Sequence, residues 1–220
     1  MTHHPMPTLN DTVMEIELVL ISVVEGLALA VLAENSLPLF HGGEWQYIPY
    51  VLGGLLFIFV FWSQAIIHLL SFIRWPLSIT HTLFYFLAGF IQVIAFGSLT
   101  NPLMWFFWCT VFSVIVAGLY MLDLKLLRQV KLELLSLPGG EELFKDSESR
   151  HRSDMFSLVP VAILFNGVCF VLLWTMPAVF LEGGYHVVLG VLQTLFSAWA
   201  LYDSARNFRT RSVLISRSRE

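Results

Sequence analysis

Three acidic residues interrupt the first long apolar segment of this chain: Glu15, Glu17 and Glu25. An ionisable side chain within an apolar membrane segment is costly unless it faces protein or water, so each one is a candidate functional residue. The alternative to a functional role is that Glu15 and Glu17 simply reach the headgroup region of the bilayer. For Glu25, which lies deeper, the alternative is a protonated or hydrogen-bonded structural role.

The spacing of these residues suggests a stripe along one helix. At ~100° per residue, Glu15, Ser22 and Glu25 fall within about 80° of one another. Leu29 and Leu32 continue the same face. Carboxylates can favour cations and apolar side chains can close a pore by dewetting, so this face predicts a pore or ion path.

The second and third apolar segments carry imidazoles and amides. Gln64 and His68 are four residues apart, and His81 and Gln92 share one face of the next segment. The short turn at 74–76 makes the two segments an antiparallel hairpin. His68 and His81 are therefore expected at similar depth, comparable to that of Glu15 and Glu17.

Three interpretations of this polar set remain open. The first is a hydrogen-bonded network that holds helices together. The second is a site that handles protons or cations. The third is a metal or b-type haem site on His68 and His81. Adjacent helices of a tight hairpin lie ~8–10 Å apart, which leaves little room for a porphyrin. No cofactor and no metal are therefore predicted, with His68 and His81 as the weak metal candidates.

The last two apolar segments contain fewer polar residues. Asn166 precedes Gly167, a pair more typical of a packing notch than of a ligand site. Gln193 joins the candidate polar network. Asp203 stands three residues before Arg206, a spacing that predicts a local ion pair.

Composition places these residues in a membrane. Of the 220 residues, 57% are hydrophobic and 13% charged, whereas soluble domains are about 25% charged. Pro38 lies beyond the first apolar segment, where a helix end is expected. The predicted fold is all-α and polytopic. It has six transmembrane helices of about 20 or more residues each, at 12–33, 47–73, 76–99, 102–123, 156–181 and 185–206.

The basic residues predict the orientation of the chain. The connections 34–46, 100–101 and 182–184 contain no Lys or Arg, and all twelve basic residues fall on the other side. The positive-inside pattern therefore places both termini in the cytoplasm, of a bacterial inner membrane or a plasma membrane. The expected parts are a cytoplasmic N-terminus (1–11), helices one to four (12–123), a cytoplasmic connection (124–155), helices five and six (156–206) and a basic cytoplasmic tail (207–220). The bilayer is the expected partner, and nucleic acid is not.

The first two helices resemble in layout the six-helix potassium-channel family of lysosomes and bacteria. The matching residues are the segment 24–31 (Val-Glu-Gly-Leu-Ala-Leu-Ala-Val) and Phe61-Trp62-Ser63-Gln64 followed by His68. The Phe-Ser-Asp signature of that family is absent, since Gly26-Leu27-Ala28 stand in its place. The resemblance implies an oligomer with a central pore, lined by the first helix and gated by side chains such as Leu29 or Leu32.

Three functions are therefore expected. The first is a channel or facilitator for cations or protons, as a homo-oligomer, lined by the acidic stripe. The second is a non-catalytic subunit of a larger membrane complex, serving as sensor, assembly factor or scaffold. The third is a haem- or metal-binding membrane protein. An enzyme is not predicted, because the chain has no phosphate-binding glycine loop, GxSxG, HExxH or CxxC motif.

Overall fold

The computed structural model describes residues 9–71, 79–129, 131–136 and 139–217, and within these ranges it is almost wholly helical. Two single-turn segments, η1 (Trp45–Tyr47) and η2 (Ala178–Glu182), lie in the connections. The α-helices are α1 (Leu9–Gly42), α2 (Ile48–Ser71), α3 (Ile79–Phe96), α4 (Pro102–Gln129), α5 (Lys131–Leu135), α6 (Gly140–Phe156), α7 (Leu158–Thr175) and α8 (His186–Arg217).

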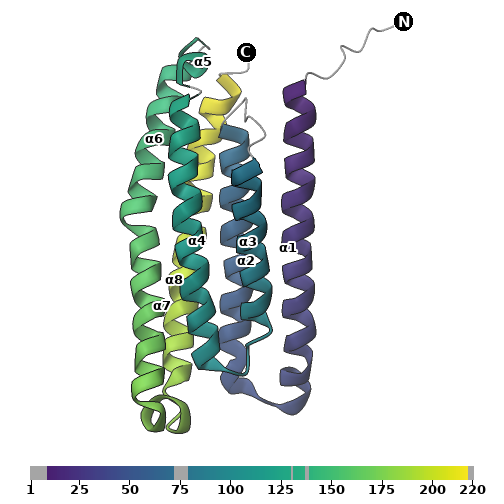
Figure 1. Cartoon of the computed structure of the whole chain (residues 1–220), viewed down its shortest axis with the longest axis vertical. Helices are drawn as coiled ribbons and strands as arrows, with labels where there is room; N and C mark the ends of the chain where they lie inside the picture. Colours follow the sequence, from purple (N-terminus) through teal and green to yellow (C-terminus); the bar gives the residue numbers. More distant parts are fainter. Residues whose placement is uncertain (1–8, 72–78, 130, 137–138, 218–220) are drawn as a thin grey trace, which may run out of the picture.

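Six helical segments are long and apolar enough to cross a membrane: α1, α2, α3, α4, the continuous α6–α7 pair and α8. This agrees with the all-α, six-helix membrane protein predicted from the sequence. The first turn of α1, the last turn of α8 and α5 lie at one end of the bundle, and the connections after α1, α3 and α7 lie at the other (Figure 1). The end with the chain termini is called the terminal end below, and the other end the turn end.

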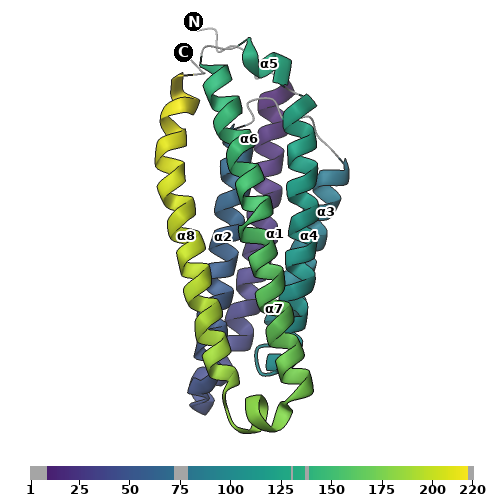
Figure 2. The ribbon, with the colours of Figure 1, turned by 90° about the vertical axis from the view of Figure 1, so that its left-hand side faces the viewer.

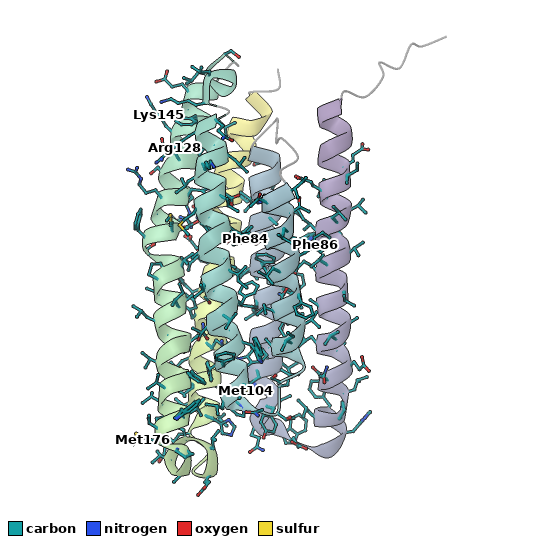
Figure 3. All side chains as sticks on the ribbon, viewed as in Figure 1. Phe84, Phe86, Met104, Arg128, Lys145 and Met176 are labelled. Atoms are coloured by element: carbon teal, nitrogen blue, oxygen red, sulfur yellow. The ribbon has the colours of Figure 1, made fainter. Side chains whose placement is uncertain are left out.

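The basic side chains of α4 and α6 follow this division. Arg128 and Lys145 lie at the terminal end, whereas Met104 and Met176 lie near the turn end (Figure 3). Arg150 and Arg152 of α6 belong to the same charged segment as Lys145. Arg128 and Lys145 therefore lie at the end opposite the turns, which contain no Lys or Arg, as the sequence pattern predicts.

The six long segments pack as a ring rather than as a stack of layers. Going around the ring, the contacting neighbours are α8, α2, α1, α3, α4 and α7. Helix α8 packs closely on α2, and α7 on α4, but α7 and α8 share few contacts. A view turned by 90° shows α8 and the α6–α7 pair as separate columns joined at the turn end (Figure 2). The seam between α7 and α8 is thus the least packed part of the ring.

The turn end of the ring is filled by aromatic side chains. Tyr50 of α2 meets the rings of Trp105 and Phe106 of α4 edge-on, with centroids 5.6 and 6.1 Å apart. Phe96 of α3 stacks on Trp105 at 6.1 Å. All four side chains are buried, and they are called the aromatic plug below. Offset and edge-on contacts of this kind suit aromatic quadrupoles.

Two glycines allow the helices around the plug to approach closely. A Cβ atom on Gly54 would lie 3.0 Å from Leu32 and 3.1 Å from Phe96. A Cβ atom on Gly190 of α8 would lie 3.2 Å from both Pro49 and Tyr50 of α2. Small residues at helix crossings let membrane helices gain van der Waals contact that larger ones would prevent.

Helices α1, α4 and α8 extend beyond the predicted boundaries. Helix α1 continues through Pro38 to Gly42. A proline removes one backbone hydrogen bond, and here that loss falls in the last turns of the helix. The charged connection is also helical, because α6 covers 140–156 and leads directly into α7. Helix α6 therefore forms a charged extension of the fifth span at the terminal end.

Candidate functional site

A cavity of about 140 Å³ lies inside the helix ring. It is lined by residues of α1, α2, α3, α4, α7 and α8. Its walls are mostly aliphatic and aromatic. Its depth along α4 runs from Phe112 to Asp123, about 17 Å at the rise of an α-helix. Its polar lining residues are Glu17, Gln64, His81, Tyr85, Ser113, Tyr120, Asp123, Asn166, Gln193 and Ser197.

A buried carboxylate between two histidines occupies the end of the cavity nearer the chain termini. Asp123 of α4, 2% exposed, has Oδ1 3.1 Å from Nε2 of His81 on α3. Its Oδ2 lies 3.3 Å from Nε2 of His151 on α6. His151 is 1% exposed. This His81–Asp123–His151 bridge joins three helices.

Glu17 projects from α1 into the same region. It lines the cavity beside His81 and Asp123, is 7% exposed, and feels the charges of both neighbours. Among the described residues, its Oε1 atom has no hydrogen-bond partner. A buried carboxylate oxygen without a partner is costly, and it is therefore the atom of this cavity best suited to receive a proton or a cation.

A second carboxyl group lies deeper on α1. Glu25, 3% exposed, is two turns from Glu17, about 12 Å along the helix. Tyr85 of α3 donates a hydrogen bond to Glu25 Oε1 at 3.3 Å. Gln92, fully buried on the same helix as Tyr85, lies close enough to act on the same carboxyl group. The α1–α3 interface thus carries polar groups from His81 inwards to Gln92.

The floor of the cavity is formed by Gln193 and Asn166, which belong to a hydrogen-bonded chain with Trp105. Trp105 donates its indole N–H to Gln193 Oε1 at 2.6 Å. Gln193 Nε2 in turn donates to Asn166 Oδ1 at 2.7 Å, and Asn166 donates to the carbonyl oxygen of Ala162 at 2.8 Å. This chain links α4, α8 and α7. Since Trp105 also belongs to the aromatic plug, the plug closes the cavity immediately beyond its floor.

Ion pairs tie the helices together above the cavity, at the terminal end. Arg150 of α6 pairs with Asp203 of α8 and, at 3.1 Å, with Asp154 of its own helix. Gln64 of α2 donates to Ser204 Oγ at 2.7 Å. These contacts join α6 and α2 to α8. Asp203 therefore pairs with a residue of a distant helix rather than with Arg206, the pairing predicted from spacing.

The structure divides the acidic stripe predicted on the first helix. Glu17, Glu25 and Leu32 are buried within the ring, and Leu32 packs against the aromatic plug. Glu15, Ser22 and Leu29 are exposed on the outer face of α1. The stripe drawn from Glu15 through Ser22 to Glu25 thus has members on both sides of the helix.

The predicted polar network is likewise separated into groups. His81 pairs with Asp123, Gln64 with Ser204, and Gln193 with Trp105 and Asn166, while Gln92 adjoins Glu25. Of the predicted set, Gln64, His81 and Gln193 share the cavity. The side chain of His68 lies outside the described residues, so the metal or haem pairing of His68 with His81 stays a prediction. Among the described residues, no group of three His, Cys, Asp or Glu is arranged to hold a metal ion.

Two central residues were missed in the sequence. Asp123 was treated only as the end of the fourth span, and His151 as part of a charged connection. A signal for Asp123 was present, since it is an acid within an apolar run, like Glu17 and Glu25. Nothing local identifies His151, because its partner is 28 residues away in the chain.

Comparison with known proteins gives no further guide to this site. No protein-family model, no curated protein and no solved structure matches this chain.

Proposed function

We propose that this protein is an integral membrane facilitator for protons or other cations, and that its path lies inside the six-helix ring. The observation that carries the proposal is the cavity itself. Every long helix lines it, and it holds a buried carboxylate, Glu17, beside the His81–Asp123–His151 bridge. A polar, ionisable group within a membrane bundle typically marks an ion or proton pathway.

The charges around Glu17 favour cations. In the part of the chain that the structure describes, no Lys or Arg lines the cavity, whereas two carboxylates do. The titratable and charged groups that face this region are Glu25 on α1, His81 and Tyr85 on α3, Tyr120 and Asp123 on α4, and Arg150, His151 and Asp154 on α6. The aromatic plug supplies a barrier on the other side, so the arrangement suits a path accessible from the terminal end.

Two neighbouring glutamates of α1 provide the test. Purified protein is reconstituted in liposomes, and decay of an imposed pH gradient is followed under a potassium diffusion potential. Glu17→Gln is expected to slow proton flux by about tenfold or more, because it removes the buried charge, while Glu15→Gln changes it by less than about twofold. Gel filtration and circular dichroism would establish that both variants are folded.

The same pair separates the internal path from the oligomeric pore that the potassium-channel resemblance implies. An oligomeric pore lined by the outer face of α1 would use Glu15, Ser22 and Leu29, which are exposed. Loss of flux in Glu15→Gln with normal flux in Glu17→Gln would therefore replace the proposal with a pore between protomers. Wild-type protein that passes neither protons nor monovalent cations would remove the facilitator function and leave the subunit alternative.

The proposal includes an orientation with both termini in the cytoplasm, supported by the basic residues at the terminal end. Lys145→Cys and Glu44→Cys place thiols on exposed sites at opposite ends. The native thiols of Cys109 and Cys169 are buried, so they should not react. A membrane-impermeant maleimide is expected to label Glu44→Cys in intact cells and Lys145→Cys only after lysis. The reverse pattern would invert the protein in the membrane.

A further inference from the structure

The walls of the cavity are more specific than proton transfer requires. Six aromatic side chains line it, namely Phe57, Phe61, Tyr85, Phe112, Tyr120 and Phe196. A proton path needs only a chain of polar groups or waters. Aromatic rings exclude water and attract cations through their faces, so this lining points to a bound molecule with an apolar body.

The size of the cavity limits that molecule. Its volume is about 140 Å³, close to the roughly 150 Å³ of an engineered apolar cavity that holds benzene. A single six-membered ring with a short side chain fits this volume, and polycyclic compounds do not. The floor residues Gln193 and Asn166 already bond to each other and to Trp105 and Ala162, so they leave little to attract a strongly polar ligand.

The expected charge of the ligand follows from the Glu17 carboxylate. Glu17 lines the cavity, is more than nine-tenths buried, and leaves Oε1 without a hydrogen-bond partner among the described residues. Asp123, by contrast, already lies between His81 and His151. An ammonium group on Glu17 would satisfy the carboxylate, whereas an anion would meet two negative charges in a medium of low dielectric constant.

We propose that the cavity binds a small organic cation with one apolar ring, a primary monoamine, with its ammonium group on Glu17 and its ring among the apolar and aromatic side chains of the cavity wall. This inference rests on the proposed function and names the substrate class of the same site. Since a proton and the ammonium group would compete for the Glu17 carboxylate, the organic cation and protons would exchange at one position.

Three probes with a shared skeleton test the inference on detergent-purified full-length protein. They are 2-phenylethylamine, the neutral 2-phenylethanol and the anionic phenylacetate, measured by equilibrium dialysis. The amine is expected to bind about tenfold or more tightly than either analogue, since only the amine offers a positive charge together with the ring. Equal binding of the three probes would overturn the inference, as would absence of amine binding.

Variants locate the binding site. Glu17→Gln is expected to weaken amine binding by about tenfold, Glu17→Asp to retain most of it, and the exposed Glu15→Gln to leave it unchanged. Ala162→Phe fills part of the cavity and should abolish binding of all three probes. Amine binding that survives both Glu17→Gln and Ala162→Phe would place the amine elsewhere and overturn the assignment.

The binding inference and the proposed function can be refuted separately. Protein that conducts protons but does not bind the amine would retain the proposed function and lose this inference. Protein that binds the amine at Glu17 but passes no cation in liposomes would retain the binding site and lose the facilitator function.

Discussion

Trp105→Ala is expected to lower the free energy of unfolding by about 3–5 kcal/mol, the range for removing a large buried side chain from a packed core. Trp105 is 1% exposed and contacts the rings of Tyr50 and Phe96. Its loss also leaves Gln193 Oε1 without its donor. An orphaned buried acceptor costs about 1–3 kcal/mol, and this cost is part of the total because both losses occur at one site.

The same substitution should open the cavity towards the turn end. Trp105 belongs to the aromatic plug and donates a hydrogen bond to Gln193 of the cavity floor, so it links the two. Trp105→Ala is therefore expected to raise passive proton leak in liposomes, whereas Trp105→Phe keeps a ring in the plug and should leak less.

Trp174 gives a matched control for this prediction. It lies on α7 and is 65% exposed on the outside of the bundle, so Trp174→Ala should change stability by no more than about 1 kcal/mol. Stability would be measured by unfolding in mixed micelles and leak by the decay of a pH gradient. Two results would contradict the role given to the plug. One is equal destabilisation by the two substitutions, and the other is a Trp105→Ala protein that leaks protons no faster than the wild type.

The number and order of the spans were predictable because they depend on a local property. Any segment of about 20 apolar residues can cross the bilayer, whatever it later contacts. The distribution of Lys and Arg then predicts which connections share one end. In the bundle, the connections without Lys or Arg do lie together at the turn end. The shared location of Glu17 and His81 also follows from this reasoning, because both lie near the same end of their helices.

The faces of α1 were harder to predict. A helical wheel gives the angles between Glu15, Ser22 and Glu25, but it does not give the rotation of the helix against its neighbours. In a soluble helix, the apolar face would fix that rotation, since it is buried. In a bilayer, both faces are apolar and packing decides instead. Among the described side chains of α1, the buried ones prove to be Glu17, Ile21, Glu25, Ala28, Leu32, Ser36 and Leu39.

Contacts between distant segments were beyond sequence reasoning for a related reason. Asp203 has Arg206 three residues away, yet it pairs with Arg150, 53 residues away in the chain. The α6 extension brings Arg150 over the seam between α7 and α8, and this depends on α6 being helical and continuous with α7. Asn166 likewise contacts a residue that is distant in the sequence. It was expected only to allow close helix packing, but its hydrogen bond from Gln193 makes it part of the cavity floor.

Asp123→Ala is expected to be the second large perturbation, with a loss of about 3 kcal/mol in the free energy of unfolding, because removing one member of a buried charged set leaves its partners unpaired. His81 and His151 would both lose their contact with the carboxylate, and α3, α4 and α6 would lose their common bridge. Asp123→Asn keeps an acceptor oxygen and should cost less, about 1–2 kcal/mol.

Asp203 provides the comparison for Asp123. Its side chain is 31% exposed and paired with Arg150, so Asp203→Ala should cost no more than about 1 kcal/mol, as for other partly exposed ion pairs. A double-mutant cycle of Asp123→Ala with His151→Ala is expected to give a coupling energy of about 1 kcal/mol, since the two residues share one contact. A coupling near zero, or an Asp203→Ala protein as unstable as Asp123→Ala, would mean that the His81–Asp123–His151 bridge does not hold the helices together. Its buried charge would then have to be explained by proton or cation transfer alone.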